Sequence, residues 1–175
     1  MRCKVNAYET EAMQHLLEEA GYEIVPFTQK ADVYVINTCS VTNMADRKSR
    51  QMLHKAKKNN PDSIVVAAGC YVQTSEKEVL NDLSVDIVIG NDRKHDLVRL
   101  LEEYSLDSVN DTVDDINDGK HGFEELFIDQ TKEHTRAFIK VQDGCNQFCS
   151  YCIIPYARGR VRSRRFENVI AEVER

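Results

Sequence analysis

Two patterns of hydrophobic and polar positions alternate along residues 1–105. Runs rich in β-branched residues, typical of buried strands in a parallel sheet, occupy three segments, 31–39, 63–70 and 85–90. Apolar residues recur at helical spacing in three others, 8–22, 43–58 and 94–105. Strands separated by helices of this length predict an α/β fold built on a doubly wound parallel sheet.

Residues that cap or interrupt helices mark where the predicted helices begin and end. Gly21 is placed as the C-terminal cap of the first helix, and the second helix has to end before Pro61. Ser75 and Glu78 fit a capping box, which predicts a further short helix before the third strand.

The alternation weakens after residue 105. Residues 106–135 are acidic and have little periodicity, so we expect a linker that carries a short strand at 126–128. A strand is expected again at 136–144, followed by a cysteine-rich loop and a helical run at 167–175. The chain therefore divides into an α/β domain at 1–105, a linker at 106–135 and the start of a second domain at 136–175.

The charges are distributed unevenly. The chain of 175 residues has a net charge of −6, and the segment 106–135 alone carries nine acidic residues and two lysines. Five arginines follow within nine residues: Arg158, Arg160, Arg162, Arg164 and Arg165. A contact with a polyanion such as RNA is expected at these arginines, unless they are solvated or paired within the protein.

The six cysteines are the main candidates for chemistry. The first residues lack the basic and apolar regions of a signal peptide, and no run of about 18 apolar residues occurs. We therefore expect a cytoplasmic protein without a membrane partner. Cysteines in that compartment are more often metal ligands or catalytic groups than disulfides.

Cys145, Cys149 and Cys152 form a CxxxCxxC arrangement directly after a predicted strand. Three thiolates at this spacing can bind three irons of a four-iron cluster and leave the fourth iron open to a small molecule. A structural zinc site would need a fourth ligand, and the nearest histidine is His134, eleven residues before Cys145. Three unrelated buried cysteines are the remaining alternative.

Cys3, Cys39 and Cys70 are far apart in sequence but have similar surroundings. Cys39 and Cys70 each end a predicted strand, and Cys3 stands just before the first helix. Because the carboxyl ends of parallel strands share one edge of a sheet, the three thiols can converge on one point. This favours a second three-cysteine cluster.

The run from 143 to 159 closely resembles the signature of the radical S-adenosylmethionine superfamily. The resemblance implies that Cys145, Cys149 and Cys152 hold a [4Fe-4S] cluster whose open iron binds S-adenosylmethionine. It also places the aromatic side chain of Tyr151 near the adenine of that cofactor. A hydrophobic cover over the cluster is the alternative role for Tyr151.

Several further segments resemble the methylthiotransferases within that superfamily: 21–27, 31–51, 65–73 and 153–164. Residues 3–11 are most similar to the branch that acts on N6-threonylcarbamoyladenosine in tRNA. The resemblance implies that Cys3, Cys39 and Cys70 hold an auxiliary [4Fe-4S] cluster. It also implies a methylthio transfer to C2 of the modified adenosine next to the anticodon, with tRNA and a reductant protein as partners.

The chain departs from this family at both of its ends. Only two residues precede Cys3, where the family has a strand, and the chain ends early in a partial α/β barrel. The resemblance thus implies an amino-terminal fragment, inactive alone, that carries the first strand and helix of a truncated barrel.

Three other functions remain open. The substrate could be isopentenyladenosine in tRNA or an aspartate of a ribosomal protein, as in related methylthiotransferases. A non-enzymatic iron-sulfur electron carrier or sensor would instead show redox cycling without cleavage of S-adenosylmethionine.

Two residues next to Cys39 have open roles, and the histidines have none. Asn37 and Thr38 either serve turn and capping chemistry or hydrogen-bond to a cluster. The five histidines are scattered, and we assign them no function.

Overall fold

Four parallel strands form the central sheet of the computed structural model, which describes residues 3–104, 110–128 and 137–175. The strands lie in the order β1 (Val33–Thr38), β2 (Ile64–Gly69), β3 (Ile87–Ile89) and β4 (Asn110–Thr112). All neighbouring pairs are parallel, and β1 pairs with β2 along its full length. The three predicted strands are therefore confirmed, and β4 adds a fourth within the segment expected to be a linker.

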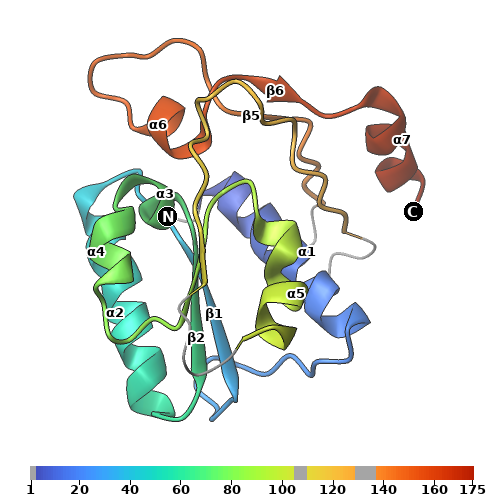
Figure 1. The fold of residues 1–175 in the computed structure, drawn as a ribbon. Helices are drawn as coiled ribbons and strands as arrows, with labels where there is room; N and C mark the ends of the chain where they lie inside the picture. Colours follow the sequence, from blue (N-terminus) through green and yellow to red (C-terminus); the bar gives the residue numbers. More distant parts are fainter. Residues whose placement is uncertain (1–2, 105–109, 129–136) are drawn as a thin grey trace.

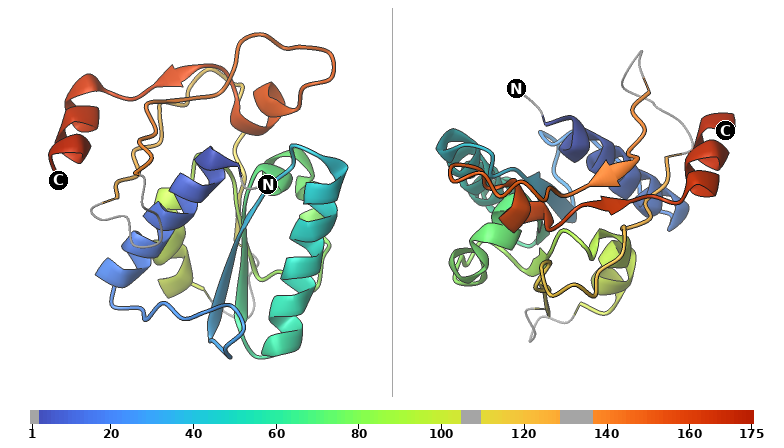
Figure 2. Two further views of the ribbon diagram at one scale, coloured as in Figure 1. Left: turned by 180° about the vertical axis from the view of Figure 1, so that it is seen from behind. Right: turned by 90° about the horizontal axis from the view of Figure 1, so that it is seen from above.

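Helices cover both faces of this sheet, as the sequence predicts for a doubly wound fold (Figures 1 and 2). One face carries α2 (Asn43–Asn59), α3 (Cys70–Thr74) and α4 (Glu76–Leu80). The other carries α1 (Lys4–Glu19), the 3-10 turn η1 (Lys94–Asp96) and α5 (Leu97–Glu102).

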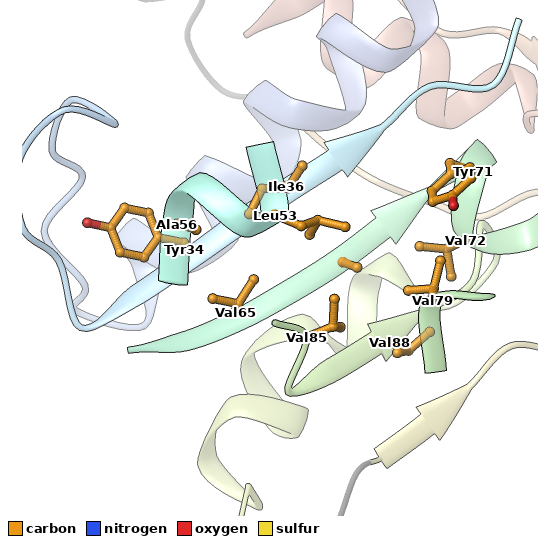
Figure 3. Close-up of a cluster of buried hydrophobic side chains, with 11 residues drawn as sticks. Tyr34, Ile36, Leu53, Ala56, Val65, Tyr71, Val72, Val79, Val85 and Val88 are labelled. Atoms are coloured by element: carbon orange, nitrogen blue, oxygen red, sulfur yellow. The ribbon is translucent and has the colours of Figure 1, made fainter. Parts of the chain in front are cut away.

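Alternate side chains of the strands feed two separate cores. On β2, Val65 and Ala67 face the core under α2, whereas Val66 and Ala68 face the core under α1 and α5. Figure 3 shows the first of these cores, in which Leu53 of α2 lies over the sheet and is fully buried. Full burial of such a side chain contributes about 1.5–3 kcal/mol, so both helical layers are held by ordinary apolar packing.

Most predicted helix ends are confirmed, but the capping box is not. Gly21 follows α1 with a positive φ of +89°, and α2 ends at Asn59, before Pro61. Ser75 does precede α4, yet it makes no side-chain capping bond. The Ser75 backbone N–H already donates to the Tyr71 carbonyl, and the Glu78 carboxylate accepts from the Tyr71 hydroxyl at 3.0 Å instead.

The last part of the chain forms small elements above the carboxyl edge of the sheet (Figure 1). In chain order these elements are β5 (Gln142–Asp143), α6 (Ile154–Arg158), β6 (Arg162–Ser163) and α7 (Phe166–Glu174). The strands β5 and β6 form an antiparallel pair. The strand expected at 136–144 is thus only two residues long where it is described. The barrel expected from residue 136 onward stays a prediction.

The strand expected at 126–128 is not formed. Leu126 and Ile128 are buried against Tyr8 and Ala12 of α1 instead. The Leu126 carbonyl accepts hydrogen bonds from the Tyr8 hydroxyl at 2.8 Å and from the Arg164 guanidinium at 3.3 Å. Side chains therefore satisfy the backbone here, and no neighbouring strand is needed.

A buried cluster of five charged residues joins this last part of the chain to α1 and η1. We call it the Glu9 cluster, and its members are Glu9, Lys94, Lys140, Asp143 and Arg158, all at most 9% exposed. The Glu9 carboxylate lies 2.7 Å from the Lys140 ammonium, 2.8 Å from the Arg158 guanidinium and 3.6 Å from the Lys94 ammonium.

Electrostatics within the cluster favour the ionised form of Glu9. Burial alone would raise the pKa of Glu9, but Lys94, Arg158 and Lys140 outweigh burial and hold that pKa well below its ordinary value. Asp143 completes the arrangement by pairing with Lys140 at 2.6 Å and with Arg158 at 3.1 Å. The cluster is therefore a buried network of ion pairs.

Replacing Glu9 with Gln should strongly destabilise the chain, by about 3–5 kcal/mol, because three buried cations lose their shared carboxylate. Glu19→Gln is the matched control on the same helix, since Glu19 is exposed and pairs with the partly exposed His15 at 3.6 Å. Its expected cost is below about 1 kcal/mol. Denaturant unfolding of both variants measures the difference, and equal stabilities would contradict the importance of the cluster.

Candidate functional site

Cys39 and Cys70 emerge side by side at the carboxyl edge of the sheet. Thr38 and Gly69 are register partners at the ends of β1 and β2, and each cysteine is the next residue in the chain. Gly69 has a φ of +98°, and a Cβ atom there would lie 2.6 Å from the Thr38 carbonyl oxygen. Only glycine permits the two strand ends to approach so closely.

Cys3 is brought to the same edge by the first turn of α1. Cys3 immediately precedes α1, and the Asn6 side chain donates to the carbonyls of Asn37 and Thr38 at 3.2 and 3.1 Å. The start of α1 is therefore fixed to the end of β1. All three cysteines lie at one edge of the sheet.

The thiols at this edge do not form a preassembled metal centre. Within the described residues, no group of three or more His, Cys, Asp or Glu side chains is arranged to hold a metal ion. Burial raises the pKa of the Cys70 thiol. The assignment of the cysteines as ligands stays a prediction.

Cys145, Cys149 and Cys152 lie in the loop between β5 and α6. The Cys145 backbone N–H donates to the Gly159 carbonyl at 3.0 Å, which closes the base of the loop. Phe148 has a φ of +46°, an unfavourable conformation for a bulky residue. The loop thus has a defined and strained backbone, with Cys149 exposed and Tyr151 90% exposed.

Asn91 is a residue of this site that the sequence analysis missed. It lies two residues after the end of β3, at the same edge of the sheet, so the same sheet-edge argument points to it. Its side-chain amide donates to the Cys70 sulfur at 3.7 Å and to the Ala157 carbonyl of α6. Because α3 and α6 are in contact, the two cysteine sets share one side of the molecule.

Asn37 and Thr38 hydrogen-bond to neighbouring elements of the fold, and a hydrogen bond from either residue to a cluster stays a prediction. The Thr38 hydroxyl donates to the Ala68 carbonyl at 2.6 Å and accepts from the Tyr71 backbone N–H at 3.2 Å. The Asn37 amide nitrogen donates to the Asn6 carbonyl and to Thr10. Their positions thus stabilise the strand end from which Cys39 emerges.

Residues 1–90, just over half of the chain, match the model of the uncharacterized protein family UPF0004. The chain belongs to this family.

Several curated relatives of this UPF0004 member are tRNA-modifying enzymes by name. This chain is 46% identical over 174 residues to the threonylcarbamoyladenosine tRNA methylthiotransferase MtaB of Bacillus subtilis (strain 168). The match covers 98% of this chain and 38% of that protein. This chain is 43% identical to the MtaB of Aquifex aeolicus (strain VF5), and the match covers 98% of this chain and 42% of that protein. A tRNA-2-methylthio-N(6)-dimethylallyladenosine synthase of Thermoanaerobacter sp. (strain X514) is 34% identical, with 98% and 37% covered. The chain thus spans about two fifths of the length of these curated relatives.

Three of the five arginines of this UPF0004 member are engaged inside the protein. Arg158 belongs to the Glu9 cluster, Arg162 pairs with Asp92 at 2.6 Å, and Arg164 pairs with Glu125 and Glu172. The exposed members are Arg160, whose guanidinium lies over the Phe148 ring, and Arg165. Internal pairing therefore accounts for most of this basic run.

A cavity of about 390 Å³ lies between the loop after β3 and the segment 121–125. Its lining contains no cysteine, but it includes His95, whose ring lies 3.3 Å from the Glu124 carboxylate, and His121, which lies 3.3 Å from Asp92. Two histidines without an expected function thus attach this segment to the sheet. His134 lies outside the described residues.

None of the helices in the described part of the chain is long and apolar enough to cross a membrane.

The pairing of His95 predicts a pH-dependent attachment of the segment around Glu124. The hydrogen bond to Glu124 raises the pKa of His95, and Asp96 adds to the effect. A raised folded-state pKa stabilises the structure below about pH 6.5, and this contribution is lost as the pH rises through the folded-state value. Because His95 is half exposed, the effect on stability should stay below about 1 kcal/mol.

NMR titration of the His95 ring should give a pKa above about 6.5, the value for an unstructured peptide. Glu124→Gln should bring that pKa back down, and His95→Gln should flatten the difference in melting temperature between pH 6 and pH 8. An unchanged His95 pKa in Glu124→Gln would show that the pair does not form in solution.

Proposed function

We propose that the protein of which this chain is a part transfers a methylthio group to C2 of N6-threonylcarbamoyladenosine, next to the anticodon of tRNA. The observation that carries the proposal is the sequence identity of 46% and 43% to two threonylcarbamoyladenosine tRNA methylthiotransferases over 98% of the chain. The dimethylallyladenosine synthase is less similar, at 34%, and makes that modified adenosine the second candidate substrate.

The two cysteine sets support this function through their donor chemistry and their places. Cys145, Cys149 and Cys152 would hold one [4Fe-4S] cluster with S-adenosylmethionine, and the three cysteines at the sheet edge would hold an auxiliary [4Fe-4S] cluster. Three thiols without a fourth protein ligand suit a cluster with one open iron better than a structural zinc ion. With S-adenosylmethionine bound, the group would supply radical chemistry, which an aryl C–H without an acidic proton requires.

The chain's own residues would hold these groups in a fixed relation. The Glu9 cluster and Asn91 join the loop of Cys145, Cys149 and Cys152 to the edge that bears Cys70. The exposed ring of Tyr151 is available to cover the adenine of S-adenosylmethionine. Arg160 and Arg165 remain for contacts with tRNA phosphates, because the other arginines of that run are paired within the protein.

The proposed division of labour follows the expected domains. Residues 1–105 would carry the auxiliary cluster and residues 136–175 would begin the radical domain, with 106–135 connecting them. A reductant protein would supply electrons to the radical cluster.

The first test uses the full-length protein after anaerobic reconstitution, with tRNA that contains threonylcarbamoyladenosine. Wild type should bind about eight irons, as two four-iron clusters, and mass spectrometry of tRNA nucleosides should show the 2-methylthio product. Replacing Cys145, Cys149 and Cys152 together with Ala should halve the iron content and abolish formation of 5′-deoxyadenosine. Cleavage of S-adenosylmethionine by this variant would refute the radical assignment. If the 2-methylthio product formed only on dimethylallyladenosine, the assignment of threonylcarbamoyladenosine as the substrate would be wrong.

The second test replaces Cys3, Cys39 and Cys70 together with Ala. This variant should also lose half of its iron and all methylthiolation, but it should still form 5′-deoxyadenosine, because the other cysteine loop is unchanged. The two triple variants serve as controls for each other. Loss of 5′-deoxyadenosine with an intact radical cluster would show that the two sites do not act separately.

A further inference from the structure

We propose that Asn91 is a positioning residue that donates a hydrogen bond to the ligand sulfur of Cys70 and ties this sulfur to the loop of the other cysteine set. The inference rests on the proposed function, because it concerns the auxiliary cluster held at Cys70. It assigns a role to a residue outside both cysteine sets.

The surroundings of Asn91 determine how its amide group is oriented. The Lys94 ammonium, which can only donate, lies 2.7 Å from Asn91 Oδ1, so the oxygen of the amide must face Lys94. The amide nitrogen then points the opposite way and has two N–H groups. One reaches the Cys70 sulfur at 3.7 Å, and the other reaches the Ala157 carbonyl.

Asn91 is also held through its backbone. Its N–H donates to the Gln73 side chain at 3.0 Å, and its carbonyl accepts from the Lys94 ammonium at 2.8 Å. The residue is only 3% exposed, and Lys94 is fully buried within the Glu9 cluster. A buried side chain whose polar atoms are all bonded has one well-defined position.

Only an amide of this length can accept a hydrogen bond from Lys94 and donate to both Cys70 and Ala157. An aspartate has the acceptor for Lys94 but no N–H groups when ionised, and an alanine has neither. The three partners lie on α3, η1 and α6, so Asn91 joins the edge that carries Cys70 to the helix that follows Cys152.

A hydrogen bond to a ligating sulfur changes the electronic properties of a cluster. An N–H donor withdraws electron density from the sulfur and stabilises the reduced cluster, which raises its reduction potential. The bond to the Ala157 carbonyl adds a mechanical effect, because it fixes the distance between α6 and Cys70. Asn91 should therefore influence both the potential of the auxiliary cluster and the coupling between the two cysteine sets.

The potential can be measured on full-length protein in which Cys145, Cys149 and Cys152 are replaced with Ala, so that only the auxiliary cluster contributes. In this background, Asn91→Asp should lower the midpoint potential in an EPR-monitored redox titration. Asn91→Asp keeps the size of the side chain and the acceptor for Lys94, and it removes both N–H donors. Gln73→Ala is the matched control: it removes the partner of the Asn91 backbone without touching the sulfur, and its potential should equal that of the background protein.

The functional coupling between the two cysteine sets is measured in protein that keeps both sets. Asn91→Ala should raise the amount of 5′-deoxyadenosine formed per methylthiolated tRNA several-fold, whereas Gln73→Ala should leave this ratio near that of wild type. A further measurement uses the wild-type protein and so does not depend on the folding of any variant. It detects the magnetic hyperfine coupling between the reduced auxiliary cluster and nitrogen in protein labelled with ¹⁵N-asparagine. The inference requires such a coupling.

The outcomes separate this inference from the proposed function. A protein that lacks the auxiliary cluster overturns both. A protein that forms the cluster and the tRNA product, but shows no asparagine coupling or the same potential in Asn91→Asp, overturns the role of Asn91 and leaves the function intact.

Discussion

The buried carboxylate of Glu9 is the constraint on which the arrangement of the chain depends. A carboxylate without solvent is stable only where cations surround it, and its three partners come from η1, the segment before β5 and α6. The fold must therefore bring residues 94, 140 and 158 together at one point on α1. Apolar packing builds the sheet and its helices, whereas this ionic contact places the last part of the chain on them.

The position of that contact has a functional consequence. α1 begins next to Cys3 at the carboxyl edge of the sheet, and α6 follows directly after the loop of Cys145, Cys149 and Cys152. By joining α1 to α6, the Glu9 cluster keeps the two cysteine sets on the same side of the molecule. A buried ion network suits this task because its geometry is specific, even where apolar residues would give comparable stability.

Internal ion pairs account for three of the five arginines in the basic run at 158–165. Arg158 and Arg164 are buried, and Arg162 is paired with Asp92, so these side chains neutralise carboxylates of the α/β part and of the acidic segment. The acidic composition of 106–135 is thus partly a complement to these arginines. Asn110–Thr112 in the same segment pairs with β3, so part of the expected linker belongs to the central sheet.

The sequence by itself determined the local structure and the chemical inventory of this protein. Patterns of β-branched and helical positions predicted the three central strands and the helices on both faces, because apolar periodicity follows directly from strand and helix geometry. The spacing of Cys145, Cys149 and Cys152, and the strand ends at Cys39 and Cys70, were likewise readable as motifs. Only the tertiary structure decided which arginines are buried, why residues 126–128 pack on α1 without forming a strand, and that Asn91 meets Cys70. Arg158 and its partner Glu9 are 149 residues apart in the chain, Leu126 and Tyr8 are 118 apart, and Asn91 and Cys70 are 21 apart. No local pattern encodes which distant side chain satisfies a buried charge or carbonyl.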